Sequence, residues 1–125
     1  MTAFIDDTAL DAALNIIKNN TENLYICGTA QPTTFTQASS TYKLGVKATP
    51  TFTGPADDTS GRKITISAIT DGTVSATGTA GWLALTDDSA SLLLAAYELT
   101  ATQAVTSGNT FSLTAFKINL PDPAV

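Results

Sequence analysis

The sequence predicts a mainly β protein: an antiparallel sandwich or barrel of six to seven strands with one N-terminal α-helix. Apolar and polar residues alternate along several stretches of the chain, which is the period of half-buried strands. A helical period occurs once, close to the N-terminus. No change of composition separates two domains in the 125 residues, so we expect a single domain with a short N-terminal arm (residues 1–7) and a C-terminal tail (residues 121–125).

The helical period starts near Thr8. Apolar residues recur at three- and four-residue spacing from Leu10 through Leu14 to Ile17, which places them on one side of a helix. We expect Thr8 to cap the first turn and Asn20 to end the helix after about three turns. Because its apolar face is narrow, this helix needs a sheet or a partner to lie on.

The segment between the helix and residue 61 predicts two strands and one long loop. Residues 23–28 form a short run of aromatic and β-branched residues, with Leu24 and Ile26 on one side of a strand. Residues 41–48 alternate most regularly and predict an amphipathic strand. Residues 49–61 contain two prolines and two glycines, which favours a loop.

Residues 62–84 predict a hairpin, and the rest of the sheet is expected to form around it. The apolar residues keep one phase through the segment only if the loop has an odd number of residues. A three-residue loop at 70–72, with Gly72 in the left-handed conformation of a bulge, would place Ala68 opposite Val74. All the apolar side chains of the hairpin would then share one face.

The last third of the chain predicts two further strands. A turn at residues 87–89 precedes residues 92–99, whose apolar side chains on both faces indicate a central strand or a strand covered by the helix. Residues 100–109 are polar and predict a link with a turn at its end. In residues 111–120 the apolar phase changes, and a bulge at residues 114–115 would restore a single apolar face.

Composition excludes several classes of function. Six basic and eleven acidic residues leave a net charge of −5, which does not favour nucleic acid or an anionic membrane as a partner. Cys27 is the single cysteine, so we expect a buried thiol and neither an internal disulfide nor a cysteine metal cluster. The longest apolar run, residues 92–97, is too short to span a bilayer, so we expect synthesis as a soluble protein in a reducing cytosol.

Candidates for chemistry are few. The chain has no histidine, which removes the commonest general base and metal ligand. The pairs Asp57-Asp58 and Asp87-Asp88 could serve as acid and base or hold calcium, but both occur where turns are expected, and aspartate favours turns. We therefore predict no enzymatic activity, no catalytic residue, no cofactor and no metal site.

Two other groups of residues have a structural and a functional interpretation. Trp82 could stack on a sugar in a glycan-binding module, but its place in the inward phase of a strand favours core packing. Lys43 and Lys47 share one strand face and could hold an acidic partner, although a solvated outer face is the simpler interpretation.

Apolar residues at both ends of the chain are the best candidates for an interface. A core rich in alanine, threonine and valine buries modest apolar area, so the fold gains stability from any partner that binds it. Frayed ends without a role are the alternative. The predicted interface residues are Phe4, Ile5, Leu120, Pro121, Pro123 and Val125.

Four segments resemble a family of small structural proteins of tailed bacteriophages. They are ALDAALNIIKNNTENLYICG, SGRKITISAITDGTVSATGTAGWLALTDD, ELTATQAVTSGNTFSLTAF and INLPDPA, and together they cover nearly the full chain. The likeness lies in the strand pattern and turn phrases and contains no catalytic motif, so it assigns no functional residue.

This resemblance implies a virion protein, assembled in the cytoplasm of the bacterial host, that decorates or cements the capsid. Its partners would be the major capsid protein and copies of itself, bound through apolar surface and through strand-edge or terminal-arm pairing. A tail or tail-tip accessory protein, with tail proteins as partners, is the alternative within the virion. A glycan-binding module is the alternative outside this class.

Overall fold

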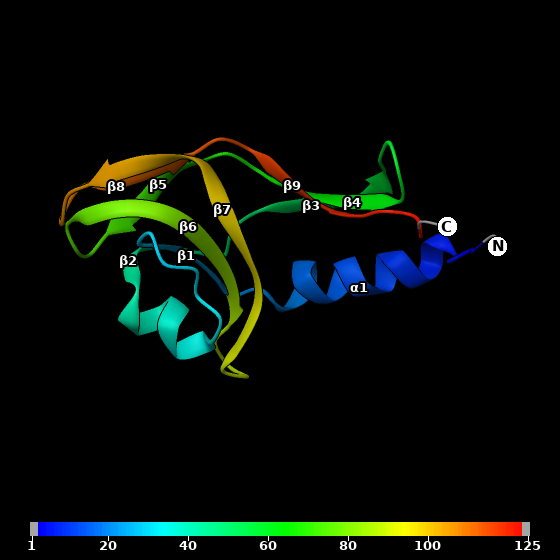
Figure 1. The fold of residues 1–125 in the computed structure, drawn as a ribbon, viewed down its shortest axis with the longest axis horizontal. Coiled ribbons are helices and arrows are strands. Elements are labelled where there is room, and N and C mark those ends of the chain that lie inside the picture. The colour runs from blue at the N-terminus through cyan, green and yellow to red at the C-terminus, as the bar shows by residue number, and fades with distance from the viewer. Residues whose placement is uncertain (1–2, 124–125) are drawn as a thin grey trace.

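The computed structural model describes residues 3–123, which form two antiparallel sheets and an N-terminal helix (Figure 1). One sheet has six strands in the order β7-β6-β1-β2-β5-β8 and curls into a half-barrel, and the other has three in the order β3-β4-β9. This confirms the predicted fold class, although nine strands occur in the described part of the chain rather than six or seven. The elements are α1 (Asp7–Asn20), β1 (Asn23–Cys27), the π-helical turn η1 (Gln37–Thr41), β2 (Lys43–Ala48), β3 (Phe52–Asp57), β4 (Arg62–Ile66), β5 (Ile69–Val74), β6 (Gly78–Asp87), β7 (Leu92–Val105), β8 (Thr110–Leu113) and β9 (Phe116–Leu120).

Helix α1 lies along the three-stranded sheet, at the end of the molecule away from the half-barrel (Figure 1). Leu10 and Leu14 are buried on its apolar face, as the spacing predicts. The cap is Asp6 rather than Thr8: the Asp6 carboxylate accepts a hydrogen bond from the Thr8 amide at 2.9 Å. Asp6 is the better cap because a carboxylate also interacts favourably with the positive end of the helix.

Strand β1 lies inside the six-stranded sheet, between β6 and β2. Leu24 and Ile26 point into the main core, as predicted, while Tyr25 and Cys27 are buried on the opposite face with Ala84. Both faces of this strand are therefore covered. Burial raises the pKa of the Cys27 thiol to about 11, in keeping with the predicted buried thiol.

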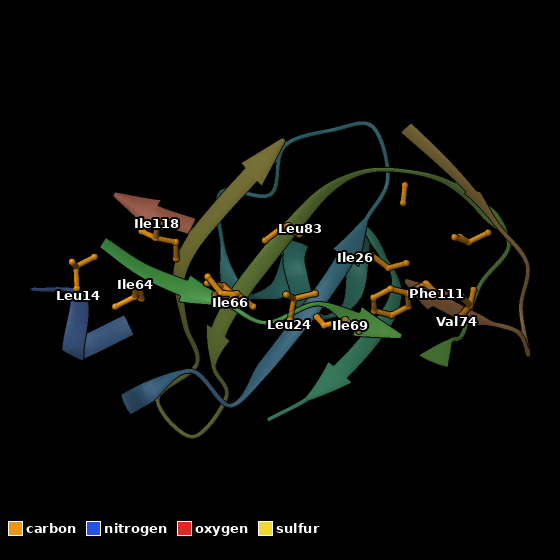
Figure 2. Close-up of a cluster of buried hydrophobic side chains, with 13 residues drawn as sticks. Leu14, Leu24, Ile26, Ile64, Ile66, Ile69, Val74, Leu83, Phe111 and Ile118 are labelled. Atoms are coloured by element: carbon orange, nitrogen blue, oxygen red, sulfur yellow. The ribbon is translucent and has the colours of Figure 1, made fainter. Parts of the chain in front are cut away.

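The main core runs the length of the molecule and joins the helix to both sheets (Figure 2). Leu14 lies at one end of it and Phe111 near the other. Its buried members are Leu14, Leu24, Ile26, Ile64, Ile66, Ile69, Val74, Ala80, Leu83, Leu85, Val105, Phe111 and Ile118. Because one core serves both sheets, residues 3–123 pack around it as one unit.

The predicted hairpin of residues 62–84 is wrong. β4 pairs with β3 and β9, whereas β5 pairs with β2 and β8, so the chain changes sheets between residues 66 and 69. Gly72 lies inside β5 instead of in a turn. A Cβ atom at this position would overlap the ring of Phe111. Glycine is therefore needed for close packing and not for a left-handed turn.

The phase change at residues 114–115 marks a second crossing between sheets rather than the predicted bulge. β8 ends at Leu113 on the six-stranded sheet, and β9 begins at Phe116 on the three-stranded sheet. The two strands bury different faces against the same core, so Phe111 and Ile118 both point inward although their phases differ.

Two other expectations need correction. The predicted loop of residues 49–61 contains strand β3, and only its last part is a turn. The predicted central strand of residues 92–99 is an edge strand, β7, which continues to Val105 and takes in much of the expected polar link. The turns at residues 87–89 and 107–109 lie where they were predicted, except that the first begins one residue later.

Candidate functional site

The N-terminal arm and the C-terminal tail lie together at one end of the molecule (Figure 1). Phe4 is 83% exposed and Ile5 is 42% exposed, the first being the most exposed large apolar residue described. With Pro123 they line a hollow of about 370 Å³ between the arm and the tail. We call Phe4, Ile5, Pro121 and Pro123 the terminal surface. Four of the six predicted interface residues thus lie at one end of the fold.

Polar contacts hold the terminal surface in place. Asp6 fixes the point where the arm enters α1. On the tail, Asp122 accepts a hydrogen bond from the Gly61 amide at 3.2 Å, and its own amide donates to the Ser60 hydroxyl at 3.1 Å. Of the other two predicted residues, Leu120 is half-buried against the main core, and Val125 lies outside the described residues.

Asp57 takes part in an ion-pair network around Arg62. The guanidinium of Arg62 donates to both oxygens of Asp11, at 2.8 and 3.1 Å, and to Asp57 at 2.6 Å. These hydrogen bonds raise the pKa of Arg62, with Asp11 as the largest cause. Because Asp11 is on α1 and Arg62 on β4, this network joins the helix to the three-stranded sheet.

Asp58 binds a different cation. It accepts two hydrogen bonds from the Lys117 ammonium, at 2.7 and 2.8 Å, and one from the Asn119 amide at 2.9 Å. The Lys117 hydrogen bond, followed by that of the Thr59 amide, lowers the pKa of Asp58. The adjacent carboxylates thus have separate partners, which is how a structural pair is bound rather than an acid and base acting on one substrate.

The second carboxylate pair also has structural partners. Asp88 accepts hydrogen bonds from the Thr86 hydroxyl at 2.6 Å and the Tyr25 hydroxyl at 2.7 Å. Burial favours a higher pKa for Asp88, but these hydrogen bonds outweigh it and lower the pKa. Burial, followed by the Asp88 bond, raises the pKa of Tyr25 to about 12. Asp87 accepts from the Ala90 amide at 3.3 Å and so stabilises the turn.

Lys43 and Lys47 do not share a strand face as predicted: Lys43 lies opposite Cys27 of the smaller core cluster and Lys47 opposite Leu24 of the main core, because the register shifts between Ile26 and Cys27. Trp82 is half-buried on the face of the smaller core cluster of Tyr25 and Cys27 and does not point into the main core. Lys43 lies over the Tyr25 ring, 5.5 Å from its centroid. Lys47 forms an ion pair with Asp71 at 3.0 Å. These contacts give Trp82 and both lysines structural partners.

A groove that sequence reasoning missed lies between β7 and β8, the end strands of the six-stranded sheet. Two hollows, of about 150 and 240 Å³, follow it. We call it the β7–β8 groove; the residues that line both hollows are Leu99, Thr100, Leu113 and Thr114. The available signal was the β7 sequence, LLLAAYELTATQAV, which has one charged residue in 14 and no proline to protect an exposed edge.

Within residues 3–123 no group of three or more histidine, cysteine, aspartate or glutamate side chains is arranged to hold a metal ion. No helix in this part of the chain is long and apolar enough to cross a membrane. Comparisons of the chain with protein-family models, with curated proteins and with solved structures give no match.

Proposed function

We propose that this chain is a non-enzymatic structural protein of a tailed-phage virion that decorates the outside of the capsid and stabilises its lattice. The observation that carries the proposal is the terminal surface, where Phe4 and Ile5 are exposed beside the anchored tail. The phage context comes from the sequence resemblance alone. The separate structural partners of Asp57, Asp58 and Asp88 support a role in which the chain binds other proteins and performs no reaction.

The proposed mechanism is burial of the terminal surface against the neighbours of the chain on the lattice, which are the major capsid protein and other copies of this chain, at the junctions of capsomers. Full burial of one large apolar side chain such as Phe4 contributes about 1.5–3 kcal/mol. One contact of this size is weak, but icosahedral symmetry repeats it at every equivalent position of the lattice. The chain would bind the assembled lattice and not the separated capsid subunits. Its binding therefore shifts the equilibrium towards the assembled lattice.

The test is to add the purified chain to phage capsids that lack it. We expect binding at many symmetric positions and a higher temperature of capsid disruption. Phe4→Asp should abolish both effects, because it places a charge in the apolar contact. Ala12→Asp, which adds the same charge at an exposed position of α1, is the matched control and should bind like wild type.

Copy number and position decide the result. Quantitative mass spectrometry of purified particles should find the chain in numbers comparable with the capsid lattice. A few copies per particle, or an antibody label at the tail in electron micrographs, would overturn capsid decoration and favour the tail alternative.

A further inference from the structure

We propose that copies of this chain associate head to tail, with the arm of one copy (residues 3–6) inserted as an added strand in the β7–β8 groove of the next. This inference deepens the self-association part of the proposed function, and its test needs only the purified chain. Two unpartnered features carry it: an open, apolar groove between two strand edges, and an exposed apolar arm that cannot reach that groove in its own molecule.

The groove has the properties of a site for strand addition. β7 pairs only with β6 and β8 only with β5 among the described strands, so each has a free edge. On the opposite edge of β7 the ladder to β6 is interrupted: Trp82 lies opposite Glu98 and Ala80 opposite Gln103, so residues 99–102 have no partner on β6. Free backbone donors and acceptors beside an apolar hollow are what an extended peptide binds.

The two edges approach each other without forming a ladder. The Gln103 side chain donates to the Ser112 carbonyl at 3.1 Å, and the rings of Tyr97 and Phe116 lie 6.3 Å apart. The first contact joins β7 to β8, and the second joins β7 to Phe116, the first residue of β9. All four residues line the hollows: Gln103 and Ser112 line one, and Tyr97 and Phe116 line the other. Leu83, Leu99 and Leu113 give the hollows apolar walls suited to a side chain such as Phe4.

The arm supplies the matching occupant. Residues 3–6 lie outside α1 and belong to no helix or strand, Asp6 has an extended backbone, and the side chains of Phe4 and Ile5 are exposed. In a strand, alternate side chains point to opposite faces, so Phe4 would enter a hollow while its neighbours faced outward. The arm's backbone would then pair with the free edge of β7 or β8.

The arm cannot fill the groove of its own molecule. β9 carries the chain from Phe116, at the groove, to Leu120, about 13 Å away, and the tail continues from there to Pro123, beside Phe4. Phe4 is only two residues from Asp6, which is fixed at the start of α1, so the Cα atom of Phe4 stays within about 7 Å of that of Asp6. A second copy must therefore supply the arm.

A contact between two different surfaces of the same chain is heterologous, so it builds closed rings or open chains. We expect the share of purified wild-type protein that is in oligomers to rise with protein concentration, as measured by light scattering or analytical ultracentrifugation. Phe4→Asp should weaken association by about tenfold or more, because it removes one buried aromatic side chain from the contact. Ala12→Asp should associate like wild type.

The groove is tested from its own side. Thr100→Arg and Thr114→Arg each place a long charged side chain at an exposed lip of the groove and should weaken association as Phe4→Asp does. Thr106→Arg makes the same change on the connection from β7 to β8 but outside the hollows, and should leave association unchanged. Circular dichroism and thermal unfolding check that each variant folds.

Mixing the two kinds of variant gives the sharpest result. Phe4→Asp keeps an intact groove and Thr114→Arg an intact arm, so an equimolar mixture should form a dimer of one copy of each, although neither associates alone. Hydrogen exchange should slow in residues 3–6 of the second variant and residues 99–103 of the first. A wild-type chain that stays monomeric, or oligomers that Phe4→Asp leaves intact, would overturn the inference. If the arm inserts in the groove of another copy but the chain does not bind capsids, the inference stands and the proposed function is wrong.

Discussion

The three-stranded sheet and the six-stranded sheet share one core, but different interactions join each to its neighbours. Three of the four ion pairs among residues 3–123 lie at the three-stranded sheet, where Arg62 binds Asp11 and Asp57 and Lys117 binds Asp58. Lys18 of α1 also donates to the Gly54 carbonyl of β3 at 2.6 Å. The six-stranded sheet has one ion pair, and instead covers both faces of β1 with apolar side chains.

This difference follows from size. Three short strands and one helix enclose too little apolar area to hold together alone, so charged side chains connect the helix to β4, the middle strand of this sheet, and to β3. Six strands enclose a core on the inner face, with a second cluster on the outer face. We therefore expect substitutions of core residues to lower the free energy of unfolding most in the six-stranded sheet. We expect salt and acid to weaken the three-stranded sheet first.

The largest effect is expected for Phe111→Ala in β8. Phe111 is fully buried, and removing such a ring costs about 3–5 kcal/mol of unfolding free energy, including the cavity that it leaves. Phe52→Ala, at a half-buried position of β3, is the matched change in the small sheet and should cost less. Urea unfolding measures both. Equal losses would contradict the contrast between the sheets.

Arg62→Met is expected to have a smaller effect. Methionine keeps apolar contacts along the side chain but loses the hydrogen bonds to Asp11 and Asp57, so α1 should separate from β4 more readily. Because the interaction is ionic, the gap between variant and wild type should narrow at ~1 M NaCl. Lys47→Met, which breaks the ion pair of the large sheet, should change stability less, since Asp71 is 68% exposed. A salt-independent loss for Arg62→Met would show that packing, not charge, joins the helix to the sheet.

The pH dependence should come partly from Asp58. Its pKa in the folded chain is below the ordinary value of 3.8, so the ionised form is favoured by folding. The stabilisation is complete above that value and is lost as the pH falls through the lowered folded-state pKa. Asp58→Asn should therefore be less stable than wild type at neutral pH and lose less stability on acidification. Lys117→Met should give the same flattened profile, and the double variant should add little to it.

The smallest effect is expected at Cys27, whose thiol should not react while the chain is folded. The side chain is fully buried and its pKa is raised to about 11. Compared with an ordinary thiol of pKa 9.0, the reactive thiolate is about 100-fold scarcer at neutral pH, apart from the lack of access. Alkylation by iodoacetamide, followed by mass spectrometry, should be undetectable in water and complete in urea. Rapid labelling of the folded chain would show that the outer cluster of the large sheet opens easily.

Local periodicity alone was sufficient to predict the helix, β1, β2 and the mainly β class. A helix that buries Leu10 and Leu14, or a strand that buries Leu24 and Ile26, carries its own period of 3.6 or 2 residues, and this period survives whatever the element packs against. The apolar ends of the chain were recognised for the opposite reason: Phe4 and Ile5 are apolar but belong to no periodic element.

Which strands pair was decided only by the tertiary structure. The phase of residues 62–84 and the phase change at residues 114–115 each fit a local turn or bulge as well as a passage between sheets. A period of 2 shows which side of a strand is apolar but not which sheet that side packs against. Glycine is required at position 72 because of the ring of Phe111, which lies 39 residues later in the chain. The β7–β8 groove and the ion pairs of Arg62 and Lys117 likewise depend on contacts between residues far apart in the chain, which no local pattern records.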